Sequence, residues 1–194
     1  MLIKNEFEVS DSVEKVWDFF EDIPQVASCL PGAELTDKIG DDSYKGTVVI
    51  GLGPVKLEFG GTADILERRE ADRTIVVDAS GADMKGRGQA ELKVNAVLTP
   101  TVKGTKVVVN LDLQVSGAAA QYGRGMIADV TSVLVGDFAT NLQNRLEAIR
   151  MGLDPNQVAS VKPASGFVIG LRALRMAIVR VFRRFFLPYR PSTN

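Results

Sequence analysis

The sequence predicts an α+β domain in which a curved antiparallel sheet wraps around one long C-terminal helix, followed by a basic amphipathic tail. Two changes in apolar periodicity indicate this fold. From about residue 34 to residue 116 apolar side chains repeat at every second position, as in half-buried antiparallel strands. From residue 117 to residue 150 they repeat about every 3.6 positions, as in an amphipathic helix. Because neither the sheet nor the helix can bury its apolar face alone, the two must close on each other.

The N-terminal segment predicts one strand and two short helices. Residues 2–9 alternate as a strand, and Ser10 and Asp11 then offer a helix cap. The first helix carries apolar side chains at helical spacing, namely Val13, Val16, Trp17 and Phe20. The second helix fits residues 23–29. It must end at Leu30-Pro31-Gly32, because the residue before proline avoids helical angles and glycine supplies the turn.

Residues 34–116 predict about six consecutive strands. In residues 55–65 apolar or small side chains fall on one face of a strand and polar side chains fall on the other. The same alternation recurs in residues 75–79, 90–98 and 107–115. Turn residues separate these segments, namely Asp41-Asp42, Gly53-Pro54, Ala71-Asp72, Gly86 to Gly88, and Lys103-Gly104.

The helix predicted after Gly117 is about 45 Å long at 1.5 Å per residue. Its apolar stripe consists of Tyr122, Met126, Ile127, Val130, Leu134, Phe138, Leu142, Leu146 and Ile149. The domain is therefore expected to span residues 1–150. Residues 151–165, which contain Gly152, Pro155 and Pro163, predict a flexible linker, and residues 166–194 form the tail.

Charge separates the domain from the segment that follows it. Residues 1–150 carry 16 basic and 23 acidic side chains, whereas residues 151–194 carry seven basic side chains and one acidic side chain. This asymmetry suggests that the tail has a partner of its own. The N-terminus shows no secretion signal, so the expected location is the cytoplasm.

Composition limits the chemistry that the chain can perform. Its 194 residues include no His and one Cys, so the commonest general base at neutral pH and the commonest metal ligand are absent. Cys29 has no imidazole to deprotonate it, which favours a buried thiol over a catalytic one. We therefore expect no catalytic residue, no metal site and no intrinsic cofactor.

Three glycine-rich motifs have plain structural interpretations. Gly51-Leu52-Gly53-Pro54 lies between two predicted strands, whereas a nucleotide loop needs backbone amides at a helix N-terminus. The same argument makes Gly86-Arg87-Gly88 a turn. Gly123-Arg124-Gly125 flanks the entrance of the long helix, which leaves open a role in a pocket where a ligand approaches the backbone.

Several of these motifs together carry a resemblance to a known family. They are residues 23–34 (IPQVASCLPGAE), Tyr44-Lys45-Gly46, Gly51-Leu52-Gly53-Pro54-Val55, Phe59-Gly60-Gly61, residues 86–90 (GRGQA) and residues 121–127 (QYGRGMI). With the order of elements, residues 1–150 resemble the carbon monoxide dehydrogenase G-subunit family within the START-like helix-grip superfamily. The resemblance implies a non-catalytic accessory protein of carbon monoxide dehydrogenase-type molybdenum hydroxylases, tied to the membrane and to quinone.

The inner face of the predicted sheet is rich in small side chains. Gly61, Ala63, Ala79, Ala90 and Ala96 alternate with Val and Leu, so the space under the long helix is expected to be under-filled. An apolar cavity of this kind suits a lipid-like guest. The candidate lining residues are Leu52, Phe59, Val77, Met84, Tyr122, Met126, Ile127 and Val130.

The stretch LRALRMAIVRVFRRFF, residues 171–186, predicts an amphipathic helix that lies on a membrane surface. An Arg near the middle of a spanning helix costs about 2.5 to 3.5 kcal/mol, and this stretch holds five Arg. Docking in a partner groove or on the domain itself remains open, whereas the continuous apolar arc disfavours nucleic acid. The candidate membrane-binding residues are Phe167, Leu171, Arg172, Leu174, Arg175, Ile178, Arg180, Phe182, Arg183, Arg184, Phe185 and Phe186.

An apolar cavity and a membrane-binding tail together favour one function over two others. We expect a protein at the inner face of the cell membrane that carries an isoprenoid quinone of the menaquinone type and links its partner, the molybdenum hydroxylase, to the membrane quinone pool. The first alternative is an adaptor that recruits the enzyme without a ligand. The second is an enzyme, since some START-like proteins are cyclases or dehydratases, but the lack of His disfavours it.

Overall fold

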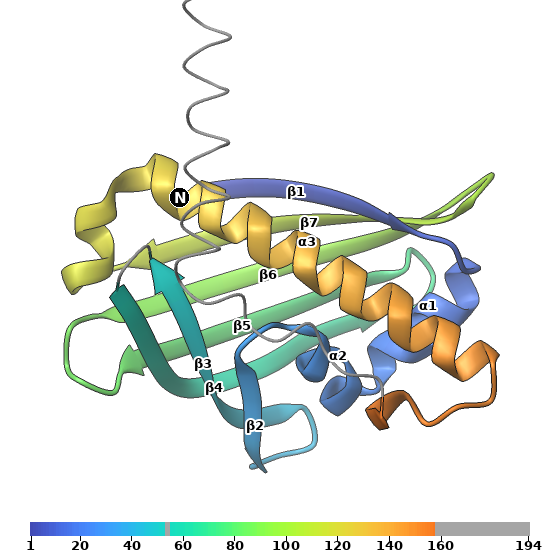
Figure 1. Cartoon of the computed structure of the whole chain (residues 1–194), viewed down its shortest axis with the longest axis horizontal. Coiled ribbons are helices and arrows are strands. Elements are labelled where there is room, and N and C mark those ends of the chain that lie inside the picture. Colours follow the sequence, from blue (N-terminus) through green and yellow to red (C-terminus); the bar gives the residue numbers. More distant parts are fainter. Residues whose placement is uncertain (53–54, 158–194) are drawn as a thin grey trace, which may run out of the picture.

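A computed structural model describes residues 1–52 and 55–157, and it confirms the predicted fold class. One seven-stranded antiparallel sheet, with the strand order β1-β7-β6-β5-β4-β3-β2, curves around one long helix (Figure 1). The strands are β1 (Leu2–Val9), β2 (Ala33–Lys38), β3 (Ser43–Leu52), β4 (Val55–Arg69), β5 (Thr74–Asp83), β6 (Gln89–Thr101) and β7 (Gly104–Val115). The helices are α1 (Val13–Glu21), α2 (Ile23–Cys29), η1 (Gly117–Tyr122), α3 (Gly123–Arg150) and η2 (Pro155–Gln157).

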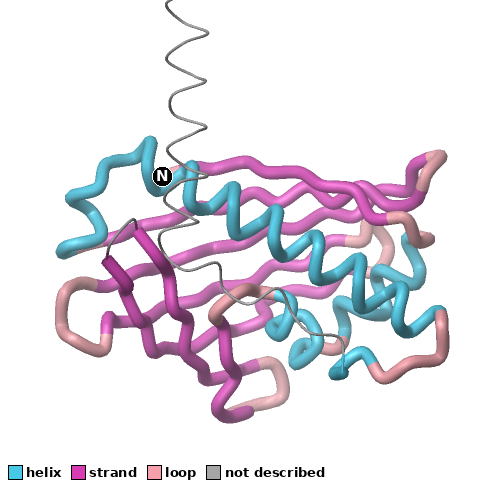
Figure 2. The backbone as a smooth tube through the Cα atoms, viewed as in Figure 1, coloured by secondary structure: helices cyan, strands magenta, loops and turns pink. Residues whose placement is uncertain are grey.

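Helix α3 crosses one face of the sheet, from η1 at one end to α1 and α2 at the other (Figure 2). The helix predicted from residue 117 begins only at residue 123, because residues 117–122 form a 3₁₀ turn. Gly117 and Gly123 have φ angles of 69° and 75°, which an α-helix excludes. The end of the helix at Arg150 is as predicted.

The cap of α1 differs from the prediction. Ser12 is the N-cap, and Ser10 and Asp11 instead hold the turn between β1 and α1 in place. The Ser10 amide donates to Oε1 of Gln143 on α3 at 2.7 Å, and the hydroxyl of Thr105 on β7 donates to the Asp11 carbonyl at 2.8 Å. In the second helix, α2, the Asp22 carboxylate serves as the cap and accepts a hydrogen bond from the Gln25 amide.

Three glycines in register allow the sheet to bend sharply. Gly61 on β4 pairs with Gly46 on β3 and with Gly81 on β5. A Cβ atom at Gly61 would collide with the carbonyl oxygen of Ser80, so the backbones approach there more closely than any other residue permits. Bulges in the β2–β3 and β4–β5 pairings add to the bend.

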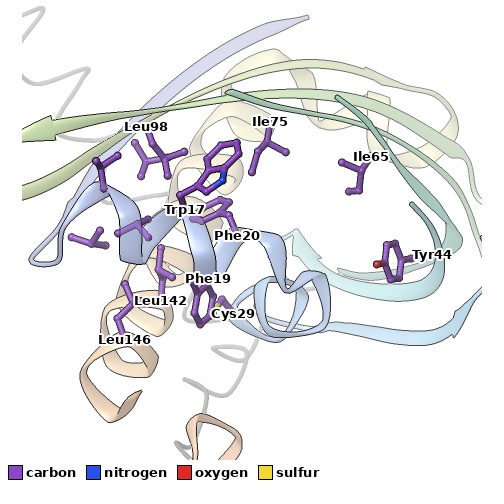
Figure 3. Packing of buried hydrophobic residues seen from close by; sticks show 14 residues of the cluster. Trp17, Phe19, Phe20, Cys29, Tyr44, Ile65, Ile75, Leu98, Leu142 and Leu146 are labelled. Carbon is purple, nitrogen blue, oxygen red and sulfur yellow. The ribbon is translucent and has the colours of Figure 1, made fainter. Parts of the chain in front are cut away.

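Two apolar clusters fill the two ends of the space between the sheet and the helices. The α1-end cluster consists of side chains from α1, the end of α2, the sheet and the second half of α3, with Trp17, Phe20 and Leu142 among its members (Figure 3). The η1-end cluster comprises Leu52, Leu57, Phe59, Ala119, Val130 and Val133. The region between the clusters is the candidate site.

Candidate ligand-binding cavity

A cavity of about 340 Å³ lies between the inner face of the sheet and helix α3. This volume falls in the range of small-molecule sites, about 300 to 1,000 Å³. Its wall comes from β2 to β7, the end of α2, η1 and the first half of α3, and it is almost entirely apolar. The cavity can therefore hold an apolar guest but offers it few hydrogen bonds.

The floor of the cavity is made of residues with little or no side chain. Gly61 and Gly81 lie in one cross-strand row that continues to Ala90 on β6, and Ala63 and Ala79 form the next row. A sheet face normally carries large apolar residues that meet the covering helix. Their absence at these five positions leaves the space that the sequence predicted.

The roof of the cavity is the first half of α3. Ile127, Val130 and Leu134 line it, about one helical turn apart on one face of the helix. The hydroxyl of Thr131 also borders the cavity, but it donates to the carbonyl of Ile127 at 2.8 Å. The roof is therefore apolar in practice.

Four of the eight predicted lining residues are in the wall: Leu52, Phe59, Ile127 and Val130. The other four lie outside it. Val77 has the inward phase but packs against the α1-end cluster. Met84 follows the last residue of β5 with the phase opposite to Gly81, and it is 65% exposed.

Tyr122 and Met126 lie outside the cavity because the helix starts later than predicted. Tyr122 ends the 3₁₀ turn and packs against the η1-end cluster. Met126 lies in the first turn of α3 and is 36% exposed. The motif Gly123-Arg124-Gly125 next to them is likewise not part of the cavity wall.

Sequence reasoning missed Tyr44, which lines the cavity at the α1 end. Tyr44 is also a member of the α1-end cluster, so it forms the boundary between the packed core and the open space (Figure 3). The alternation of the strand could have identified it, because Tyr44 and Val48 are separated by an even number of positions on β3 and therefore lie on the same face of the sheet, which lines the cavity.

An ion pair between a buried carboxylate and a partly exposed guanidinium lies at the opposite end of the domain. The Asp83 carboxylate, which is fully buried, accepts hydrogen bonds from Nε and Nη2 of Arg87, both at 2.8 Å, and from the backbone amide of Glu58. Arg87 in turn donates to the Lys56 carbonyl, and its own carbonyl accepts from the Ala118 amide. The Arg87 guanidinium holds the pKa of Asp83 well below its ordinary value. This pair ties the start of β4 and the 3₁₀ turn η1 together.

A second polar network holds α2 and η2 against α3. Arg145, which is buried, donates to Oε1 of Gln25 at 3.0 Å and to the carbonyl of Pro155 at 2.9 Å. The side-chain amide of Gln25 also donates to Asn156. Residues 155–157 of the predicted linker are therefore attached to the domain, and its residues from 158 on and the whole predicted tail, 166–194, lie outside the described residues.

Cys29 and the carboxylates are the side chains of the described residues that could ligate a metal ion. Cys29 is fully buried, and burial raises the pKa of its thiol to about 11, as expected for a structural thiol. Within residues 1–52 and 55–157 no three carboxylate or thiol side chains converge on a point where a metal ion could sit. In the same residues no helix is long and apolar enough to cross a bilayer.

Comparisons with known proteins support the fold and the family. The family model for CoxG, the G subunit of carbon monoxide dehydrogenase, matches residues 6–147. No curated protein matches the sequence significantly.

Solved structures share the fold at low sequence identity. A conserved protein from Geobacillus kaustophilus is 23% identical with a TM-score of 0.68, over 76% of this chain and 95% of the other. A START superfamily protein from Mycobacterium smegmatis is 16% identical with a TM-score of 0.54, over 76% and 98%. The Zhui aromatase/cyclase from Streptomyces is 13% identical with a TM-score of 0.50, over 78% and 95%. The fold is therefore START-like, and because the same fold occurs in an enzyme, it does not decide function.

Proposed function

Because this chain belongs to the CoxG family of carbon monoxide dehydrogenase, we propose that it is a non-catalytic accessory protein of a carbon monoxide dehydrogenase-type molybdenum hydroxylase. In this proposal it carries an isoprenoid quinone, taken from the membrane, in the cavity under α3. It thereby links the enzyme to the membrane quinone pool. The enzyme and the membrane are its two partners, and the protein itself supplies no redox group.

The apolar cavity is the observation that carries the proposal. An isoprenoid quinone is apolar along its chain and has two carbonyl oxygens on its ring, so it needs an apolar wall with few polar groups. The wall of the 340 Å³ cavity has this character. A protein that served as a purely structural adaptor would gain stability from larger side chains in place of Ala63, Ala79 and Ala90, because unfilled apolar space costs packing energy.

The lack of an acid–base pair among the described lining residues supports a carrier over an enzyme. The titratable side chains among these residues are Glu34 and Tyr44. Glu34 is exposed on the edge strand β2, and Tyr44 is buried, so no acid–base pair of the described wall faces a common point. Binding without turnover is the chemistry that such a wall supports.

The cavity proposal is tested by extracting the ligand from the purified protein. The full chain is produced in a bacterium that makes menaquinone, purified without detergent and extracted with organic solvent, and quinone is measured by mass spectrometry. We expect close to one quinone per protein, and the Ala82→Phe variant should retain it, because Ala82 is exposed and lies outside the cavity wall. Trace quinone in a protein that still recruits the hydroxylase to membranes would favour the adaptor.

The proposed attachment to the membrane is tested by changing the basic tail, residues 166–194. Deleting it should leave the domain folded and abolish sedimentation with anionic liposomes, because Arg side chains near such a surface contribute about 1 kcal/mol each. Phe182→Asp should have the same effect at any salt concentration, while the control Ser192→Asp adds the same charge outside the predicted helix. Equal sedimentation of Phe182→Asp and the intact chain would contradict a membrane-surface helix and favour a protein groove.

A further inference from the structure

The hydroxyl of Tyr44 is the polar group that the cavity presents to its guest. Tyr44 is 8% exposed and lines the cavity at the α1 end. No hydrogen bond joins its hydroxyl to a side chain or backbone group of the described residues, and the hydroxyl is not one of their enclosed polar atoms that lack a partner, as expected for an oxygen that borders open space. In Figure 3 the oxygen points into the interior, toward the side of α2. Tyr hydroxyls inside a protein normally have a hydrogen-bond partner, so this one is available for a ligand in the cavity.

The neighbours of Tyr44 hold its ring but leave its hydroxyl free. On β4 the paired residue is Ala63, and on the next strand the row continues with Ala79. On β2 the paired residue is Lys38, whose ammonium lies 5.8 Å from the centre of the Tyr44 ring. The ring is thus fixed on one side by a cation and open on the other side, above two alanines.

The remaining polar lining residues do not compete for this role. Thr47, Thr62 and Ser80 have the outward phase of their strands, so they border the cavity with their backbone. Glu34 also has the outward phase and is exposed on the edge strand. The hydroxyl of Thr131 donates to the helix backbone. Among the described lining residues, Tyr44 alone places an inward-facing hydroxyl without a partner.

We infer that the Tyr44 hydroxyl donates a hydrogen bond to a carbonyl oxygen of the bound molecule and thereby sets its orientation. The inference rests on the proposed function and deepens it. The carbonyl-bearing ring lies at the α1 end, next to Tyr44, and the isoprenoid chain extends toward Leu52, Leu57 and Ala119 at the η1 end. Because exposed Glu34 also borders the cavity, the ring lies near the β2 edge, where a partner enzyme has access to it.

This orientation makes the cavity selective for a guest with an acceptor at one end. A bound hydrocarbon of the same shape covers the hydroxyl without offering it a partner, whereas a quinone accepts its hydrogen bond. Replacing the hydroxyl by hydrogen should therefore weaken quinone binding and leave hydrocarbon binding unchanged. The protein without a ligand should be at least as stable after the change, because the hydroxyl has no partner to lose among the described residues.

The test compares the full chain with its Tyr44→Phe variant, both freed of ligand. One probe is a 1,4-naphthoquinone with a short isoprenoid chain, and the other is an isoprenoid hydrocarbon of equal chain length. We expect the dissociation constant for the quinone to rise about three- to tenfold in Tyr44→Phe, as for the loss of one neutral hydrogen bond. The carbonyl stretching band of the bound quinone, measured by infrared spectroscopy, should move to higher frequency. Tyr122→Phe, outside the cavity wall, is the matched control and should change neither value.

Three results would overturn the inference, and they are distinguishable. Unchanged quinone affinity and an unchanged carbonyl band in Tyr44→Phe would show that the head group lies elsewhere, while the carrier function would stand. Equal weakening for the quinone and the hydrocarbon would show that Tyr44 acts through packing. Failure of the unsubstituted protein to bind the quinone at all would remove the proposed function together with the inference.

Discussion

Substituting Ala90 by Phe would decide whether the space under α3 is a true cavity. Ala90 lies on β6, pairs with Gly81 on β5 and Val115 on β7, and lines the cavity wall. It already carries a Cβ atom that points inward, so a larger side chain at this position extends into the cavity and not into the sheet.

The sign of the stability change distinguishes an open space from a packed core. Fully burying a Phe side chain contributes about 1.5 to 3 kcal/mol relative to an exposed one. The loss of rotamer freedom offsets part of this, so a net gain of about 1 kcal/mol is expected if the 340 Å³ is empty in the free protein. For a domain of this size that gain raises the melting temperature by about 2 to 4 °C. A core that was already full would instead lose about 1 to 3 kcal/mol through overpacking.

The assay combines thermal unfolding with measurement of bound quinone. The Ala90→Phe variant should melt at a higher temperature than the ligand-free protein, contain no quinone and no longer couple the partner enzyme to quinone reduction. Ala82→Phe, an identical change at an exposed position, should retain quinone and coupling. A lower melting temperature with quinone still bound at full occupancy would refute the reasoning, because it would mean that Ala90 lies in packed core and that the ligand binds elsewhere.

Three further predictions concern the stability or reactivity of individual residues. Gly61→Ala should destabilise the domain by about 3 kcal/mol in urea unfolding, because the added Cβ meets the Ser80 carbonyl, and an unchanged midpoint would contradict the close strand approach. The folded-state pKa of Asp83 lies below its ordinary value of 3.8, so the unfolded chain binds a proton first as the pH falls, and the stabilisation present above about pH 5 is lost progressively below about pH 4. The stability difference between the protein and its Arg87→Leu variant should therefore shrink below about pH 4, and a constant difference down to about pH 2 would rule out this linkage. Cys29, with a thiol pKa of about 11, should not react with a thiol reagent at about pH 8 until the protein unfolds, and rapid labelling of native protein would contradict its burial.

The periodicity of the sequence was sufficient to predict the sheet, α2 and the end of α3. Apolar side chains repeat at every second position in the strands and about every 3.6 positions in α3. A glycine or proline marks several of the boundaries, including the end of α2. The start of α3 could not be predicted in the same way, because Tyr122 and Met126 continue the helical repeat although Gly123 has a left-handed φ angle of 75°. An apolar period does not reveal the φ angle of a glycine within it.

The sequence predicted only part of the cavity wall, because the alternation along a strand does not show which side chains lie beside each other on neighbouring strands. Strand phase correctly placed Leu52 and Phe59, whereas Met84 has the outward phase and is exposed. Tyr44 was missed because its role depends on its cross-strand neighbours. Whether a tyrosine hydroxyl finds a partner depends on the residues around it, here Ala63 on the paired strand, and that pairing is fixed by the register of β3 and β4.

The two kinds of small residue on the cavity floor have different causes, and this difference supports a ligand. Gly46 and Gly61 cannot be replaced without a clash between a Cβ atom and a neighbouring carbonyl, so the bend of the sheet alone accounts for them. Ala63, Ala79 and Ala90 are under no such constraint, since each already points a Cβ atom into the open space. Larger side chains there would fill the cavity and stabilise the domain, so the fold by itself does not explain why these positions stay small. A guest that needs the room would explain it, and under our proposal the same guest would accept the hydrogen bond for which the Tyr44 hydroxyl has no partner among the described residues.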